Sequence, residues 1–96
     1  MQSTGSKVEA WCLVRGTVQG VGFRDFVSEA AQGCGIQGWV RNETDGTVRV
    51  CAQGTPDALK ELVEYLHEGS VMSQVTAVEV EWRDVDVVYD DFGIWR

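Results

Sequence analysis

The chain has 96 residues, of which 44% are hydrophobic and 24% are charged. This composition is typical of a globular protein and excludes a disordered chain. Fifteen acidic residues against eight basic ones leave a net charge of −7. A surface of this sign repels phosphate backbones, which argues against nucleic acid as a partner. The length predicts one domain, and we expect it to span residues 7–96 after a disordered tail of residues 1–6.

No segment carries the signals of a membrane or secreted protein. No apolar run approaches the ~18 residues of a membrane span. The polar residues 1–7 lack the apolar stretch of a secretory signal. Three cysteines are an odd number for a disulfide framework. We therefore expect a monomer in the reducing cytoplasm, with no membrane association.

The first third of the chain predicts a strand, a loop and a helix. Apolar and polar residues alternate with a period of two over Val8–Val14, which predicts a strand. Three glycines within Gly16–Gly22 predict a loop. After it, apolar residues recur on one face of a helix that starts at Phe23 and ends at Gly33 or Gly35.

The rest of the chain adds a hairpin, a second helix and further strands. Thr55 before Pro56 is a typical helix start, with the threonine as N-cap and the proline at the first helical position. The predicted elements are a strand at Ile36–Arg41, a turn at Asp45-Gly46, a strand at Val48–Gln53, a helix from Thr55 to a stop at Gly69, a strand at Val75–Trp82 and a short strand at Phe92–Ile94.

This order predicts an α+β fold, the ferredoxin-like split βαβ sandwich, in which βαββαβ is followed by a short final strand. Right-handed crossovers place both helices on one face of an antiparallel sheet. We expect the other face, with Trp11, Leu13, Cys51 and Gln53, to be open to water or to a partner. The alternation places Cys12 and Cys51 on opposite faces, which argues against a disulfide between them.

The segment between the first strand and the first helix carries the strongest functional signal. Glycines at positions 16, 20 and 22 let the backbone curl so that successive amides point inward. The helix N-terminus adds free N–H groups and partial positive charge. Together they predict a nest for a tetrahedral anion, over which Arg24 can close with a bidentate guanidinium. From the residues alone, the alternative is a glycine-rich turn with a surface arginine.

Two blocks of this sequence resemble the signatures of the acylphosphatase family. The first block is Val18–Arg24, and the second is Gly38–Asn42 followed by Asp45–Val48. The spacing between the blocks matches as well, and the resemblance covers about residues 8–95. It implies the same ferredoxin-like fold that the periodicity predicts independently.

The resemblance also implies a function, the hydrolysis of small-molecule acyl phosphates to a carboxylate and inorganic phosphate, without a metal or cofactor. Arg24 matches the catalytic arginine of the family, and Asn42 matches the asparagine that orients the attacking water. From the residues alone, Asn42 is also explained as a turn residue before Asp45. The implied phosphate-binding residues are Gln19, Gly20, Val21, Gly22, Phe23 and Arg24.

A non-catalytic module is the alternative function. Acylphosphatase-like domains also occur at the start of hydrogenase maturation proteins, so a copy could bind an acyl phosphate or another anion without turnover. The chain also departs from the family pattern. Ser70 stands where the family has proline, and Ser73 stands where it has alanine. We expect both serines to lie away from the phosphate loop, and therefore to change the stiffness of the loop after the second helix rather than the activity.

Three further signals are set aside. The G-x-G-x-x-G pattern at Gly33–Gly38 follows a helix and precedes a strand, the reverse of the dinucleotide-binding order. His67, the only histidine, is expected on the surface of the second helix. Acidic residues between Asp84 and Asp91 are expected in a solvated loop, and no group of residues has the spacing of a metal site. The sequence assigns no role to Trp95 and Arg96.

Overall fold

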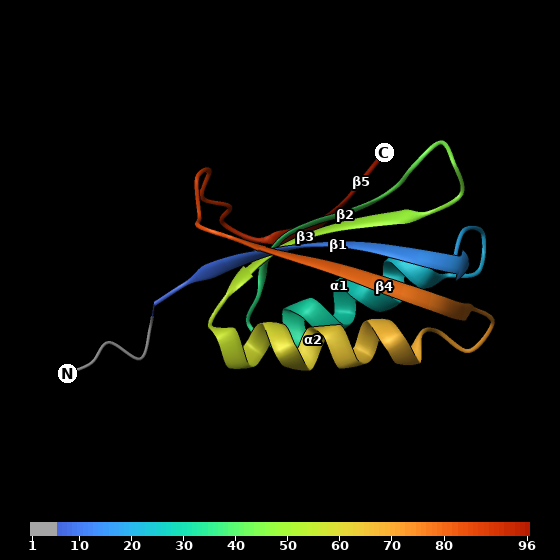
Figure 1. Cartoon of the computed structure of the whole chain (residues 1–96), viewed down its shortest axis with the longest axis horizontal. Helices are drawn as coiled ribbons and strands as arrows, with labels where there is room; N and C mark the ends of the chain where they lie inside the picture. Colours follow the sequence, from blue (N-terminus) through green and yellow to red (C-terminus); the bar gives the residue numbers. More distant parts are fainter. Residues whose placement is uncertain (1–5) are drawn as a thin grey trace.

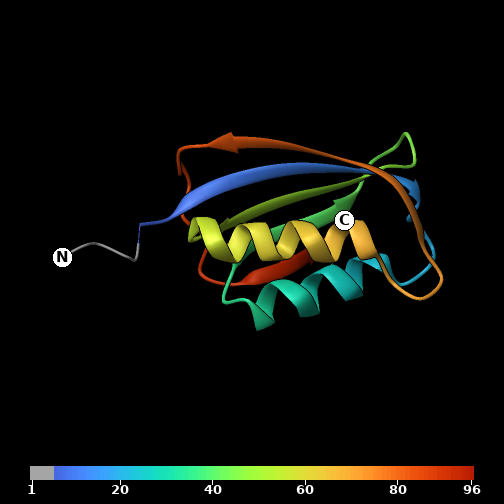
Figure 2. The ribbon, with the colours of Figure 1, turned by 60° about the horizontal axis from the view of Figure 1, so that its bottom comes forward.

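The structure, a computed structural model, describes residues 6–96, so that residues 1–5 of the predicted tail lie outside the described part. A five-stranded sheet is covered on one side by two helices (Figures 1 and 2). The elements in chain order are β1 (Val8–Thr17), α1 (Phe23–Gly33), β2 (Gln37–Asn42), β3 (Val48–Gly54), α2 (Pro56–Glu68), β4 (Gln74–Arg83) and β5 (Phe92–Trp95).

The strand order is β4-β1-β3-β2-β5, with β1 and β3 paired at the centre. This confirms the predicted split βαβ sandwich, in which each helix connects two strands of one sheet. The four strands of the sandwich run antiparallel, as predicted, whereas the added strand β5 pairs parallel to β2 and makes the sheet mixed. Strand β1 is three residues longer than its alternation predicts, because it continues to Thr17 beyond a register irregularity at Arg15/Gly16.

The hydrophobic core lies between the sheet and the two helices. Thr55 caps α2 as predicted, since its hydroxyl accepts a 3.2 Å hydrogen bond from the amide of Ala58, and Gly69 ends the helix. Burial of the apolar side chains between the sheet and the helices is the main force that fixes the helices on the sheet. The fully buried core side chains include Cys12, Val14, Val27, Val40, Val48, Val50, Leu59, Leu62 and Leu66.

The second face of the sheet is not open along its whole length, which corrects the expectation above. Gln53 is only 1% exposed there, because the segment between β4 and β5 folds over it. The Gln53 side-chain amide donates to the carbonyl of Val87, and its oxygen accepts a 3.1 Å hydrogen bond from the Tyr89 amide. The acidic side chains of this segment are exposed as predicted, but its backbone supplies a cover that strand alternation cannot predict.

Candidate active site

The glycine-rich loop joins the end of β1 to the start of α1. Val18 and Phe23 anchor its two ends, as each is only 1% exposed in the core. Gly20 and Gly22 adopt left-handed backbone conformations, with φ of 75° and 74°. Residues other than glycine rarely adopt these conformations. The first hydrogen bond of the helix runs from the Phe26 amide to the Gly22 carbonyl at 3.1 Å. The amides before Phe26 therefore have no acceptor within the helix.

A cavity of about 380 Å³ lies against this loop. It brings together residues from three separate parts of the chain, namely the loop with the first turn of α1, the end of β2, and β5 with the residue after it. The lining residues are Val18, Gly20, Gly22, Phe23, Arg24, Asp25, Asn42, Ile94 and Arg96. Five of the residues singled out from the sequence thus line one cavity: Gly20, Gly22, Phe23, Arg24 and Asn42.

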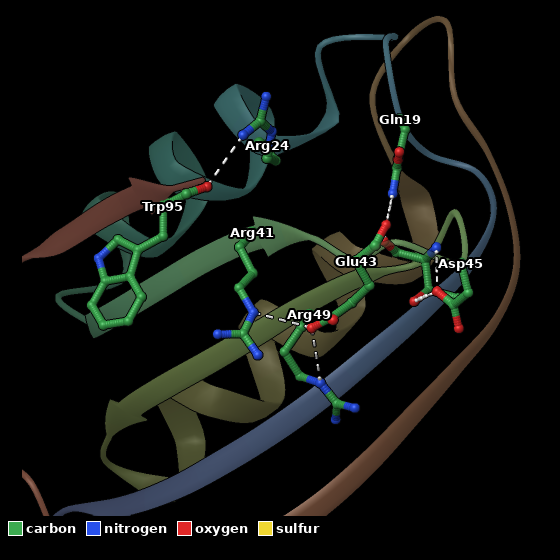
Figure 3. A network of polar contacts seen from close by, with 8 residues as sticks. Gln19, Arg24, Arg41, Glu43, Asp45, Arg49 and Trp95 are labelled. Atoms are coloured by element: carbon green, nitrogen blue, oxygen red, sulfur yellow. Dashed lines mark hydrogen bonds and ion pairs between the residues drawn. The ribbon is translucent and has the colours of Figure 1, made fainter.

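Arg24 is half-buried at the start of α1, and β5 holds its side chain in place. The Arg24 guanidinium donates a 3.2 Å hydrogen bond to the carbonyl oxygen of Trp95 (Figure 3). The Trp95 ring points to the other face of the sheet, where it stacks on Trp39 with the ring centroids 4.7 Å apart. The backbone of β5 is therefore a fixed acceptor beside the cavity, and this gives Trp95 the role that the sequence left unassigned.

Asn42 is the last residue of β2, and its side chain forms no hydrogen bond within residues 6–96. Its Oδ1 atom is buried without a donor. The turn that follows is held by another residue, since the Asp45 carboxylate accepts hydrogen bonds from the hydroxyl and the amide of Thr47. These two hydrogen bonds lower the pKa of Asp45 below its ordinary value, and the bond from the Thr47 hydroxyl has the larger effect. The geometry therefore assigns the turn to Asp45, and Asn42 lines the cavity while its buried Oδ1 has no donor within the described residues.

Gln19 and Val21 do not line the cavity. The Gln19 side-chain amide donates two 2.8 Å hydrogen bonds, to the carbonyl oxygens of Glu43 and Thr47. These bonds fasten the loop to the hairpin that carries Asn42 (Figure 3). The side chain of Glu43 in turn pairs with Arg41 and Arg49 on the second face of the sheet. The side chain of Gln19 thus connects two parts of the site.

Ser70 contacts the loop, contrary to the expectation that it lies away from it. Its hydroxyl, in the turn between α2 and β4, donates a 3.1 Å hydrogen bond to the carbonyl oxygen of Val21. Ser73 stays within its own turn, where its hydroxyl donates to the Ser70 carbonyl at 2.8 Å. The sequence could not reveal the contact of Ser70, because 49 positions separate it from Val21.

The arginines divide into two groups by their partners. Of the six arginines in the chain, four form ion pairs with glutamates: Arg15, Arg41, Arg49 and Arg83. Arg24 and Arg96 form no ion pair within the described residues, and these are the two that line the cavity. In a chain with almost twice as many acidic as basic residues, this leaves the positive charge of the cavity available to an anion.

A model of the acylphosphatase family matches residues 10–94. The chain belongs to the acylphosphatase family. It is 46% identical over 95 residues to an acylphosphatase from Bifidobacterium longum, a match that covers 98% of each chain. The crystal structure of acylphosphatase from Bacillus subtilis superposes with a TM-score of 0.90 at 37% identity, over 93% of this chain and 99% of that one.

The fold also matches part of a larger protein. HypF of T. kodakarensis superposes with a TM-score of 0.80 at 24% identity, over 91% of this chain but only 12% of that chain. This likeness concerns the fold alone. The full-length matches above are to acylphosphatases that stand by themselves.

Other kinds of site find little support in the structure. Within residues 6–96, no three side chains of the metal-ligating types lie close enough together to hold a metal ion. No helix in this part of the chain is long and apolar enough to cross a membrane. His67 is exposed on α2, as predicted. The cavity beside the glycine-rich loop is the candidate active site of this chain.

Proposed function

We propose that this acylphosphatase hydrolyses acyl phosphates to a carboxylate and inorganic phosphate by direct attack of water on phosphorus. The phosphoryl group lies in the loop of residues 19–23, whose backbone amides bind its oxygens, and Arg24 binds it from the helix side. The single observation that best supports this arrangement is that Arg24 and Asn42 line the same cavity as the two left-handed glycines.

Charge stabilisation comes from groups that are in place before substrate binds. The left-handed glycines form a concave set of amides of the kind that binds phosphate oxygens, and the first turn of α1 adds its free N–H groups. Arg24 has no neutral form near pH 7 and can bind two phosphoryl oxygens at once. Because the Trp95 carbonyl holds it at 3.2 Å, little reorganisation is needed as charge develops in the transition state.

Asn42 orients the nucleophile. A water molecule bound to the side-chain amide of Asn42, which lines the cavity, is held so that its lone pair points toward phosphorus. The oxygen–phosphorus bond to water forms while the bond from phosphorus to the acyl oxygen breaks, and the carboxylate leaves with the bonding electrons. An amide is a poor base, so the proton of the water passes to a phosphoryl oxygen. The substrate is already activated by its carboxylate leaving group, and positioning and charge neutralisation therefore suffice.

The proposed enzyme needs no cofactor, and it acts as a monomer in the cytoplasm. Its substrate is a small molecule, as for the family as a whole. Arg24, Asn42 and the loop amides supply every group that the reaction uses. The alternative function, an anion-binding module without turnover, makes the same contacts with phosphate but leaves the anhydride intact.

An assay with acetyl phosphate tests this function. The wild-type protein, treated exhaustively with EDTA, is expected to release phosphate at an undiminished rate. Arg24→Lys is expected to lower kcat/KM by a factor on the order of 10² to 10³, because an ammonium cannot bind in bidentate fashion. Arg83→Gln is the matched control, since Arg83 pairs with Glu81 away from the cavity. Phosphate binding without turnover would support the module instead, and near-normal activity of Arg24→Lys would remove Arg24 from the mechanism.

A further inference from the structure

The cavity is larger than the phosphoryl group requires. At about 30 Å³ for each water-sized group, a volume of 380 Å³ holds on the order of a dozen such groups, and the four oxygens of a phosphate occupy about a third of it. The remaining space accommodates an acyl group of several atoms. The residues beside that space then decide which acyl groups are accepted.

Strand β5 and the residue after it line one part of the cavity. Alternation along this strand directs Phe92 into the core, where it is 6% exposed, and brings Ile94 and Arg96 to the cavity. The ring of Trp95 points the other way, to the stack with Trp39. Ile94 and Arg96 therefore follow one another along the cavity, with Arg96 directly after the end of the strand.

The Arg24 guanidinium lies close to the backbone of Arg96, and both residues line the cavity. The carbonyl that accepts from Arg24 at 3.2 Å belongs to the peptide group between Trp95 and Arg96. Consecutive Cα atoms across such a peptide are only about 3.8 Å apart. A ligand of a few bonds can therefore contact Arg24 and Arg96 together. The acidic residue Asp25 also lines the cavity. It lies on the side that borders a neighbouring groove at Ser70 and Val71, and no residue of β5 lines that groove.

The lack of an acidic partner for Arg96 within residues 6–96 indicates that this residue is suited to bind an anion. Every arginine outside the cavity is paired with a glutamate, whereas Arg24 and Arg96 form no ion pair within residues 6–96. In the proposed function the phosphoryl group takes one of these two cations. The second cation is then suited to another anionic group on the same substrate, at a distance set by the acyl chain.

We propose that Ile94 and Arg96 form an acyl subsite, which selects short acyl phosphates that carry a second carboxylate at the far end of the acyl chain. The inference rests on the proposed function, because it takes the phosphoryl group to lie at Arg24 and the loop. The methylene groups of the substrate contact Ile94, and the terminal carboxylate binds the Arg96 guanidinium. A mono-acyl phosphate of a four-carbon dicarboxylic acid fits this description.

Two substrates with the same four-carbon chain test the subsite. Succinyl phosphate ends in a carboxylate, and butyryl phosphate ends in a methyl group. The wild-type enzyme is expected to show the higher kcat/KM with succinyl phosphate. Arg96→Gln is expected to lower this value about tenfold, which corresponds to about 1.4 kcal/mol, and to change the value for butyryl phosphate less than about twofold. Because the substitution leaves the backbone as it is, it isolates the guanidinium.

Controls separate this inference from the function on which it rests. Arg83→Gln removes an equal charge away from the cavity and is expected to leave the ratio of the two substrates unchanged. Equal losses with both substrates in Arg96→Gln, or no loss with either, would overturn the acyl subsite while hydrolysis itself stands. If the wild-type enzyme hydrolyses neither substrate, the proposed function fails, and the subsite fails with it.

Discussion

The hydroxyl of Ser70 donates a 3.1 Å hydrogen bond to the carbonyl oxygen of Val21. The peptide group that contains this carbonyl also contains the amide of Gly22, a residue that lines the cavity. In a planar trans peptide the carbonyl and the N–H point in opposite directions. By fixing the carbonyl of Val21 toward the turn between α2 and β4, Ser70 therefore fixes the direction of the Gly22 amide.

Ser70→Ala is expected to weaken phosphate binding. Loss of a hydrogen bond of this kind is worth about 0.5–1.5 kcal/mol, so the inhibition constant for inorganic phosphate should rise about two- to tenfold. The value of kcat should change less, because the loop still closes around the transition state. Ser70→Thr keeps the hydroxyl and should restore wild-type inhibition, and Thr76→Ala on β4 serves as the control. An unchanged inhibition constant in Ser70→Ala would show that the loop holds its shape without Ser70.

Trp95→Ala is expected to reduce activity although its ring does not line the cavity. The ring stacks on Trp39 at an interplanar angle of 14°, and the backbone carbonyl of the same residue holds Arg24. Removing the ring loses about 0.5–1.5 kcal/mol of stabilisation from the aromatic pair. It also lets β5 move at the Trp95 carbonyl, which accepts the hydrogen bond from Arg24. Measurement of Tm together with kcat/KM should show both falling, and Trp95→Phe should recover most of both.

The control for the tryptophan experiment is Trp82→Ala on β4. Trp82 is 49% exposed and contributes nothing to the cavity. Its loss is expected to leave kcat/KM near the wild-type value. If Trp82→Ala and Trp95→Ala reduce activity equally, the effect of Trp95 is a general loss of stability and not a displacement of Arg24.

The thiols of Cys12 and Cys51 are expected to resist alkylation in the folded protein. The strand register pairs Cys12 with Val50 and Cys51 with Trp11, which places the two thiols on opposite faces, as their alternation predicts, and all three cysteines are free. Burial raises the pKa of both thiols from 9.0 to about 12. At pH 8 the reactive thiolate is then on the order of one molecule in ten thousand. Mass spectrometry after treatment with iodoacetamide should find both residues modified only once the chain is unfolded.

The same shift gives stability a pH dependence of known sign. Above pH 9 the unfolded chain loses these thiol protons while the folded protein keeps them, so the free energy of unfolding falls as the pH rises from 9 toward 12. A Cys12→Ala, Cys51→Ala double variant should show a weaker decline over this range. A wild-type protein whose stability is constant between pH 9 and 11 would contradict the raised pKa values.

The sequence predicted the parts of the site that depend on local chemistry. Gly20, Gly22 and Arg24 follow from the turn between a strand and a helix, whereas Asn42 follows only from the resemblance to the acylphosphatase family, since its place before a hairpin turn by itself indicates a turn residue. It could not predict Ser70 or Trp95, because their contacts with the site join segments that are far apart in the chain. Such contacts follow from the topology of the sheet and produce no periodic pattern in the amino-acid sequence.

The second face of the sheet shows the same limit. Alternation places Gln53 on this face correctly, but it cannot say what covers the face. The cover is the backbone of Val87 and Tyr89, which satisfies both ends of the Gln53 amide. A buried amide needs such partners, and this requirement is the one signal in the sequence that could have predicted the cover.

Asn42→Ala is expected to separate catalysis from binding. If Asn42 orients the attacking water, its interaction strengthens only in the transition state, so kcat falls while the inhibition constant for phosphate stays nearly constant. By analogy with an oxyanion-hole donor, the loss should be on the order of 2–4 kcal/mol. Stability should not fall, because the Asn42 side chain forms no hydrogen bond in the described residues and its buried Oδ1 has no donor.

Thermal unfolding and steady-state kinetics of the same Asn42→Ala sample decide between catalysis and structure. A turn residue would give a lower Tm with kcat per folded molecule unchanged, as expected for Asp45→Ala, whose carboxylate holds the turn through Thr47. Asp45→Ala is therefore the structural comparison for Asn42→Ala. A folded Asn42→Ala protein with wild-type kcat would leave Arg24 and the loop amides as the whole catalytic site, because no other side chain within residues 6–96 has a buried acceptor without a partner.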